Sequence, residues 1–331
     1  MLRQLVDSAA WRGSNIRRIA RRRRDMMPAR GIRAPALVIA RRRTLLESPV
    51  DANGAFLVGA TADTIWEVPV YLPYLQPALT DEAVQSAEEQ VGYVLPKEYL
   101  DLLRKQNGGG IRYCLPENVH DMIAGIGPYF PSLTAFDWDE WQEQVSYPLH
   151  GLVPFDGDGH WYLCLDYRTN LRFPAITLAD LECDEETHVA DSFAAYLALL
   201  RVCVEDEYVV EAVSDIERVK ADLSRMLGVP FDPPDTGAHG YLTERARFGA
   251  EGNPQWLWIS PNTVPRGFVR ENDRRYAELK DLMPGLAERF PELPAGSYIL
   301  NATDGVRAKV LEACNKTGLF VRPLREYVEG I

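Results

Sequence analysis

The sequence predicts an α+β protein, and three features in chain order support this prediction. An amphipathic helix pair lies between Thr80 and Gly110, a strand hairpin follows at 151–168, and a further helix begins near Ser192. The chain has 331 residues, of which 46% are hydrophobic and 25% charged, as is typical of a soluble globular protein. This length predicts two domains, each large enough to bury a core.

The helix pair has recognisable ends. Thr80 is a good N-cap for the first helix, and Gly92 can take the left-handed conformation that ends it. The second helix is predicted to begin with Pro96 at its first position and to end at the run Asn-Gly-Gly-Gly, residues 107–110. Apolar residues at helical spacing predict one buried stripe on the first helix: Val84, Ala87 and Val91.

The strand hairpin is predicted from alternating apolar residues. Residues 152–155 lead into a turn at 156–159, and the outgoing strand covers 161–167. We expect one face of that strand to carry Trp161, Leu163 and Leu165.

Beyond the hairpin, residues 173–178 are a further strand candidate, and the acidic run 180–186 is predicted to be a solvated link. Asp191 or Ser192 caps the next helix.

The C-terminal third predicts a small α/β module. We expect a long helix over 206–227, ended by Gly228, and a proline-containing linker up to residue 234. The elements expected after it are a strand at 255–260, a helix at 272–282, a turn or helix at 285–290, a strand at 296–301, a helix at 304–315 and a short strand at 319–322.

The first 43 residues carry 13 arginines against two aspartates. Such a segment cannot bury enough apolar surface to fold alone, so we expect residues 1–45 to be a disordered basic leader. Three interpretations stay open: a solvated tail with translation starting at or after Met26, an arm that binds nucleic acid or an anionic membrane, and a mitochondrial-type presequence. The remaining predicted boundaries are a domain at 46–205, a helix and linker at 206–234, and a small α/β C-terminal domain of unknown type at 235–331.

The predicted first domain is strongly acidic. Residues 75–205 contain 22 acidic and 7 basic residues. Such a surface repels the phosphates of nucleic acids and attracts basic proteins, whose encounter it accelerates. We therefore predict a basic protein partner and no nucleic-acid binding through the folded body.

Motifs of catalysis are missing from the sequence. It contains no HExxH, no P-loop, no zinc-deaminase signature and no GxSxG, so we predict a non-enzymatic protein without cofactor or metal. The run 156–159, Asp-Gly-Asp-Gly, is similar to the start of a calcium loop, but Tyr167 stands where the loop requires Glu. A hairpin turn is the better interpretation.

Cysteine usage and hydropathy predict a cytoplasmic protein. The five cysteines are widely spread and form no CxxC pair, which favours reduced thiols over disulfides or a zinc ribbon. No apolar run approaches the roughly 18 residues that a membrane span requires.

The candidate partner-binding residues are acidic or aromatic. The run 137–143 suits a short helix with an acidic side, and the alternative is an ordinary amphipathic helix whose tryptophans belong to the core. The acidic link 180–186 is either simply solvated or steers a basic partner. The predicted set is Asp137, Trp138, Asp139, Glu140, Glu143, Asp156 and Asp158.

Several motifs in one order resemble a known family. They are Leu79-Thr80-Asp81-Glu82, Leu95-Pro96-Lys97-Glu98-Tyr99, Gln106-Asn107-Gly108-Gly109, Asp158-Gly159-His160 and Leu163-Cys164-Leu165-Asp166-Tyr167-Arg168. Over roughly residues 60–205 this pattern resembles the SUKH superfamily, in particular the branch of the fungal Smi and Knr cell-wall regulators. The resemblance implies N-terminal helices and a C-terminal helix against a mostly antiparallel sheet. It also implies a binding role, since many bacterial members look like immunity proteins that block polymorphic toxins.

The sequence therefore predicts a non-enzymatic immunity protein that neutralises a nuclease or deaminase toxin by protein–protein contact. One alternative is a regulatory or scaffold protein of the cell-wall-regulator type without a toxin partner. The other is an enzyme whose site lies in the C-terminal domain.

Overall fold

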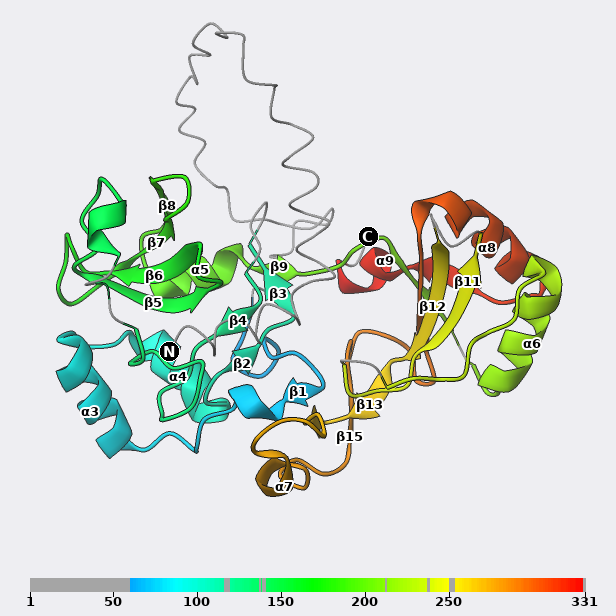
Figure 1. The fold of residues 1–331 in the computed structure, drawn as a ribbon, viewed down its shortest axis with the longest axis horizontal. Helices are drawn as coiled ribbons and strands as arrows, with labels where there is room; N and C mark the ends of the chain where they lie inside the picture. Colours follow the sequence, from blue (N-terminus) through cyan, green and yellow to red (C-terminus); the bar gives the residue numbers. More distant parts are fainter. Residues whose placement is uncertain are drawn as a thin grey trace, which may run out of the picture. The chain divides into compact units, whose positions relative to one another are not determined.

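The computed structural model describes residues 60–329, with gaps at 116–119, 137, 139–140, 212, 237–238 and 250–253. The chain divides into two compact units, Met1–Val50 and Asp51–Ile331, and all described residues belong to the second. The predicted leader therefore lies outside the described residues. The α+β prediction is confirmed, since helices and mostly antiparallel sheets make up the second unit (Figure 1). The domain boundaries within this unit stay a prediction.

The helix pair forms as predicted. Thr80 caps the first helix by accepting a hydrogen bond from the Ala83 N–H, and Gly92 ends it with a φ of 81°. Pro96 is the N-cap of the second helix, so this helix begins one residue later than predicted. The elements of this part are β1 (Val70–Tyr71), η1 (Leu72–Tyr74), α3 (Asp81–Val91), α4 (Lys97–Lys105), β2 (Gly109–Gly110), β3 (Tyr113–Cys114) and β4 (Met122–Ile123).

The turn after α4 is held by a buried asparagine. The Asn107 side chain accepts a hydrogen bond from the Ile126 N–H at 2.8 Å and donates to the Ile126 carbonyl at 2.9 Å. Gly108 follows with a φ of 89°, and a Cβ there would lie 2.6 Å from the backbone nitrogen of Gly125. The Asn-Gly pair therefore brings two backbone segments closer than any side chain would allow.

A four-stranded antiparallel sheet lies against these helices. Its order is β5-β6-β7-β8, and Leu163 of β6 pairs with Leu178 of β7. Leu163 and Leu165 face the main core as predicted, whereas Tyr162 and Cys164 belong to a second cluster on the other face. The strands are β5 (Leu152–Gly157), β6 (Trp161–Asp166), β7 (Ala175–Asp180) and β8 (Glu185–Ala190), preceded by η2 (Gln142–Gln144).

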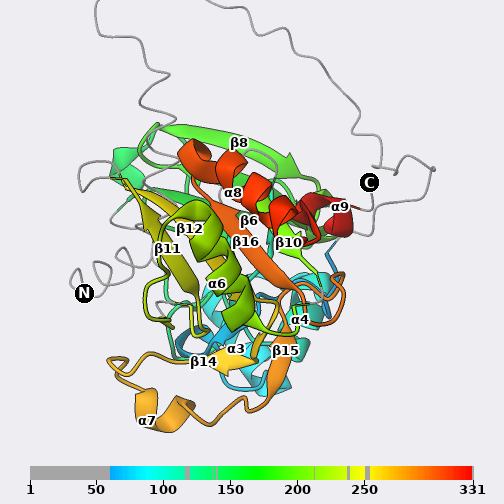
Figure 2. The same ribbon diagram turned by 90° about the vertical axis from the view of Figure 1, so that its right-hand side faces the viewer.

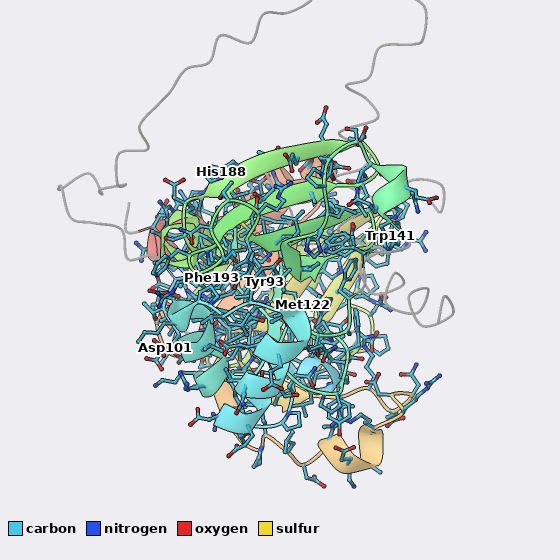
Figure 3. All side chains as sticks on the ribbon, turned by 90° about the vertical axis from the view of Figure 1, so that its left-hand side faces the viewer. Tyr93, Asp101, Met122, Trp141, His188 and Phe193 are labelled. Atoms are coloured by element: carbon cyan, nitrogen blue, oxygen red, sulfur yellow. The ribbon has the colours of Figure 1, made fainter. Side chains whose placement is uncertain are left out.

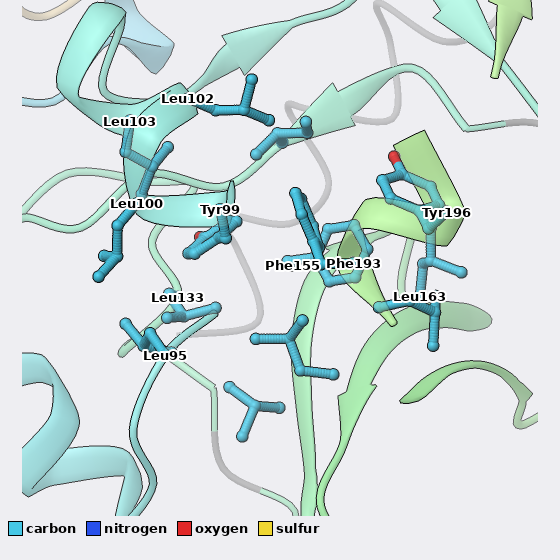
Figure 4. Packing of buried hydrophobic residues seen from close by; sticks show 14 of the residues in the cluster. Leu95, Tyr99, Leu100, Leu102, Leu103, Leu133, Phe155, Leu163, Phe193 and Tyr196 are labelled. Carbon is cyan, nitrogen blue, oxygen red and sulfur yellow. The ribbon is translucent and has the colours of Figure 1, made fainter. Parts of the chain in front are cut away.

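Aromatic residues fill the core between helices and sheet (Figure 4). The Phe193 ring meets Tyr99 edge-on at 5.4 Å and Phe155 at 5.6 Å, a favourable aromatic geometry. Phe193 opens α5 (Phe193–Leu199), which Ser192 caps by accepting from the Ala195 N–H. Of the two caps that the sequence allows, Asp191 and Ser192, the structure has Ser192.

The C-terminal part contains a five-stranded sheet of order β11-β12-β16-β10-β17. Helices α6 and α8 contact each other and pack on one face of this sheet, as Figures 1 and 2 show. The strands here are β9 (Arg201–Val202), β10 (Glu207–Val210), β11 (Glu244–Phe248), β12 (Gln255–Pro261), β13 (Thr263–Pro265), β14 (Gly267–Phe268), β15 (Leu286–Glu288), β16 (Tyr298–Ala302) and β17 (Val321–Pro323). The helices are α6 (Ile216–Leu227), α7 (Tyr276–Leu279), α8 (Asp304–Lys316) and α9 (Leu324–Val328).

The predicted helix over 206–227 is wrong in its first half. Val209 and Val210 are fully buried in β10, which pairs with both β16 and β17. The helix starts only at Ile216, where the Asp215 side chain accepts hydrogen bonds from two backbone N–H groups. Pairing with two distant strands therefore overrides a local pattern that suited a helix.

Three shorter predictions also need correction. The predicted helix at 272–282 is reduced to α7, and the segment 285–290 contains a strand, β15. The acidic link 180–186 is not a plain loop, because its ends belong to the paired strands β7 and β8. The short helix expected at 137–143 is represented among the described residues by the 3-10 turn η2.

Residues of the predicted first domain contact the C-terminal part. Val70 of β1 pairs with Gly267 of β14, and the Tyr71 hydroxyl donates to Asp273 at 2.7 Å. The buried Arg112 donates to the Arg289 carbonyl at 3.3 Å and forms an ion pair with Glu292. These contacts explain why residues 51–331 form one compact unit.

Candidate protein-interaction surface

The hairpin of β7 and β8 concentrates exposed carboxylates. Asp180 closes its turn by accepting from the N–H groups of Glu182 and Cys183, and Asp184 adopts a left-handed φ of 53°. The residues from 182 to 188 are all exposed. This turn therefore directs its acidic side chains to solvent.

The hairpin lies beside the segment that follows Trp141. The Ser146 N–H donates to the Asp184 carboxylate at 2.6 Å, and the Tyr147 hydroxyl donates to the Asp180 carbonyl at 3.2 Å. The segment that carries Glu143 and the acidic turn of β7 and β8, which the sequence separates by some forty residues, are thus adjacent. We call the combined region the acidic hairpin surface, defined by Glu143, Asp158, Glu182, Asp184, Glu185 and Glu186.

One arginine partly neutralises this surface. Arg168 pairs with Asp166 at 2.6 Å and with Glu186 at 2.7 Å. Burial alone would raise the pKa of Asp166, but hydrogen bonds from Arg168 and Thr177 hold it below its usual value. No lysine or arginine occurs in the sequence from 173 to 200. The surface therefore carries an excess of negative charge.

The predicted acidic–aromatic run is only partly described. Asp137, Asp139 and Glu140 lie outside the described residues. Glu143 is exposed in η2 and belongs to the surface. Trp138 is half-buried: its indole N–H donates to the Leu152 carbonyl at 2.7 Å, and its ring packs on Phe136 and Tyr162. These contacts are those of a core residue.

The two predicted aspartates of the turn have different surroundings. Asp158 is half-buried and accepts from the N–H groups of His160 and Trp161, so it shapes the turn. Asp156 is only 5% exposed and lies in β5, not in the turn. Because it faces the interior, we leave it out of the surface.

Asp156 belongs to a buried polar network that the sequence analysis missed. His120 Nδ1 lies 2.6 Å from the Asp156 carboxylate, and His120 Nε2 hydrogen-bonds to the Tyr196 hydroxyl. Burial, and after it the charge of Asp156, raises the pKa of Tyr196 well above its usual value. Both ring nitrogens of His120 are engaged, so the network satisfies buried polar groups rather than presenting a base to a substrate. Asp156 and Tyr196 follow His120 in the sequence by 36 and 76 positions, respectively, so no local motif reveals the network.

A second group of titratable side chains surrounds Arg289. Arg289 donates to the Ser260 hydroxyl at 2.9 Å, and its guanidinium lies 4.6 Å from the centre of the Tyr241 ring. Burial, and after it the charge of Asp121, raises the pKa of Glu67 to about 7, although Arg289 opposes the shift. Acids with a perturbed pKa are enriched in functional sites, so the group around Arg289 is the candidate for a catalytic site.

Neither a metal centre nor a membrane span is found in the described ranges. No group of three or more histidine, cysteine or acidic side chains gathers there in a way that would hold a metal ion. No helix in the same ranges has the length and apolar character needed to cross a membrane.

Comparison with known proteins supports the resemblance deduced from the motifs. Residues 78–199 match the SMI1 / KNR4 family (SUKH-1), so the predicted SUKH relationship is confirmed for this region. At the level of the family, the match supports an immunity or regulatory role. No curated protein and no solved structure matches the chain.

Proposed function

We propose, from the membership of residues 78–199 in the SMI1 / KNR4 family, that this protein is a non-enzymatic immunity protein. In this proposal it acts in the cytoplasm and neutralises a polymorphic toxin of the nuclease or deaminase type by protein–protein contact. The toxin domain is basic, and the acidic hairpin surface is the region that meets it.

The observation that supports this proposal is the group of exposed carboxylates on the β7–β8 hairpin, beside which the segment carrying Glu143 is held by the hydrogen bond from the Ser146 N–H to Asp184. An enzyme that acts on nucleic acid presents a cationic cleft, so an acidic protein surface is complementary to it. Complementary fields of this kind accelerate association by about 10- to 1000-fold at low salt.

The proposal is tested with the candidate toxin as it exists in the cell. The full-length chain is used to purify its bound protein, and the identified toxin is then assayed with and without an equimolar amount of this chain. We expect stoichiometric inhibition of the toxin and association that slows steeply as salt is added. A toxin that stays fully active when the complex is saturated contradicts the proposal.

Charge reversal locates the interaction. We expect Glu143→Lys combined with Glu182→Lys to slow association at low salt by at least about tenfold. Glu271→Lys combined with Glu326→Lys makes the same change in net charge at exposed positions of the C-terminal part and is the matched control. Equal on-rates for the two double variants would remove the acidic hairpin surface from the proposal.

The regulatory alternative draws on the same family match. A scaffold of the cell-wall-regulator type would bind a cellular partner without inhibiting a toxin. Identification of the bound protein separates this alternative from the first, because a regulator's partner has no toxic activity to lose.

The catalytic alternative has one observation in its favour, the elevated pKa of Glu67 beside Arg289 and Tyr241. If this group catalyses a reaction, Glu67→Gln abolishes turnover of a metabolite by the purified chain while leaving the fold intact. Under the immunity proposal, Glu67→Gln leaves toxin inhibition unchanged.

A further inference from the structure

The outer strand of the four-stranded sheet offers an open edge. Among the strands that the structure describes, β8 pairs only with β7, and its residues 185–188 are exposed. At the opposite edge, β5 is partly covered, because Phe155 accepts a hydrogen bond from the Ala124 N–H at 2.8 Å. Figure 3 shows β8, with His188, as the outermost strand. Along such an edge, alternate residues leave their N–H and C=O groups available to another chain.

The charge along this edge selects among possible occupants. A second copy of this chain, paired antiparallel over the whole of β8, would set Glu185 opposite Ala190 and Glu186 opposite Val189, so its strand would offer neither carboxylate a positive partner. Arg168 already pairs with Glu186, but no ion pair within the described part of the chain reaches Glu185. A cationic strand would offer these carboxylates positive partners, and the edge therefore favours it over a second copy of this chain.

An exposed aromatic residue marks the far end of the edge. Phe173 is 70% exposed and Leu171 67% exposed, in the connection between β6 and β7. Phe173 lies just before β7, at the end of the sheet where Ile176 pairs with Ala190, the last residue of β8. The edge thus runs from an acidic turn to an apolar end. Exposed aromatic side chains of this kind are enriched in protein interfaces.

We propose that β8 binds an extended, lysine- or arginine-rich segment of a protein partner as an additional antiparallel or parallel strand, with Phe173 contacting an apolar residue at the end of that segment. The proposal rests on the proposed binding function and specifies the geometry of the partner. Main-chain hydrogen bonds to β8 supply the affinity, and Glu182 and Glu185 select for positive charge and raise the rate of association.

A peptide with a modified backbone tests this geometry. The probe is a ten-residue peptide of alternating lysine and threonine with a leucine at one end, and its control carries an N-methyl group on every residue, so that neither edge can donate. The control keeps the charge but cannot complete the strand ladder. We expect the unmodified peptide to bind the full-length chain at least ten times more tightly and to slow amide exchange at 185–190 by at least tenfold. Equal binding of both peptides, or protection elsewhere, overturns the proposal.

Variants of the chain provide the second measurement. We expect Glu182→Lys combined with Glu185→Lys to weaken binding of the unmodified peptide at least tenfold, and Phe173→Ser to weaken it a few-fold. The matched control, Glu271→Lys combined with Glu326→Lys, keeps its affinity. Unchanged affinity in the hairpin variant overturns the proposal. So does a dimer in sedimentation that already protects 185–190 without peptide, because the occupant is then a second copy.

The outcomes separate this proposal from the immunity function. If the chain inhibits a toxin but binds both peptides equally, the strand geometry fails and the proposed function stands. If the peptide adds to β8 but the co-purified partner is not a toxin that the chain inhibits, the proposed function fails and the strand geometry stands.

Discussion

The turn at Asn107 and the hairpin ending in β8 both contain many polar groups, but they satisfy them in opposite ways. Asn107 is 4% exposed, and its side chain exchanges two hydrogen bonds with the backbone of Ile126. The carboxylates of the hairpin face solvent, and Glu185 has no ion pair within the described residues. The first region satisfies its groups internally, whereas the second leaves much of its charge exposed to solvent.

The residues that carry the family resemblance are therefore different from the residues that we propose to bind a partner. The Asn-Gly motif that carries the resemblance acts in folding, because it closes the helix pair onto Gly125 and Ile126. The acidic hairpin lies within the matched region but outside that motif. Variants of the two regions should therefore change different observables, stability in one case and association in the other.

The largest effect is expected in the buried network that Asp156 joins. Asp156→Ala leaves His120 without its carboxylate partner in a site from which water is excluded. We expect the free energy of unfolding to fall by about 3 to 4 kcal/mol. Urea denaturation measures this loss, and Asp156→Asn, which keeps a hydrogen-bonding oxygen, should lose less. A loss below about 1 kcal/mol would mean that Asp156 is not part of the folded core.

The next effect concerns the Asn107 turn itself. Gly108→Ala places a Cβ 2.6 Å from the Gly125 nitrogen at a backbone φ of 89°. We expect a loss of about 2 to 3 kcal/mol in unfolding free energy, because both strain and a clash are introduced. Gly159→Ala is an informative comparison, since Gly159 also has a positive φ but meets nothing within 4 Å. It should cost less, and equal losses would show that the close approach to Gly125 is unimportant.

Sequence reasoning predicted best where local chemistry decides the structure. The caps at Thr80 and Ser192, the stop at Gly92 and the alternation in β6 all depend on residues within a few positions of one another. They are therefore visible without tertiary information.

The sequence-based predictions failed where contacts between segments distant in the sequence determine the structure. β10 is a strand because β16 and β17 pair with it, and Asp156 is buried because His120 reaches it from 36 positions away. The union of Glu143 with the β7–β8 hairpin depends on a contact between Ser146 and Asp184, 38 positions apart. Such contacts have no local signal, so the sequence identified the acidic residues but not which of them lie near the hairpin.

A smaller effect is expected from Glu67, a carboxyl that belongs to neither of the two regions compared. Its pKa is raised from 4.5 to about 7, mainly by burial, so the folded chain binds a proton there more strongly than the unfolded chain. This contribution to stability is complete below about pH 4.5 and is lost as the pH rises through 7. The Glu67 carboxyl is desolvated where it lies close to Gly110, but the residue as a whole is exposed and water screens it, so we expect a contribution of only about 1 kcal/mol. Urea denaturation of Glu67→Gln at pH 5 and pH 8 should show a flatter profile than the parent chain, and parallel profiles contradict the assignment.

The smallest effect on stability is expected where the effect on association is largest. Glu182 and Glu185 are exposed, and within the described ranges the carboxylate of Glu182 forms an ion pair with His160, at 3.3 Å. Reversing both charges to lysine should change the free energy of unfolding by no more than about 0.5 kcal/mol. The same variant should associate with a cationic partner at least about tenfold more slowly at low salt. If this variant instead loses as much unfolding free energy as Gly108→Ala, the hairpin is a structural element like the Asn107 turn. Its acidic residues then have no separate role in binding.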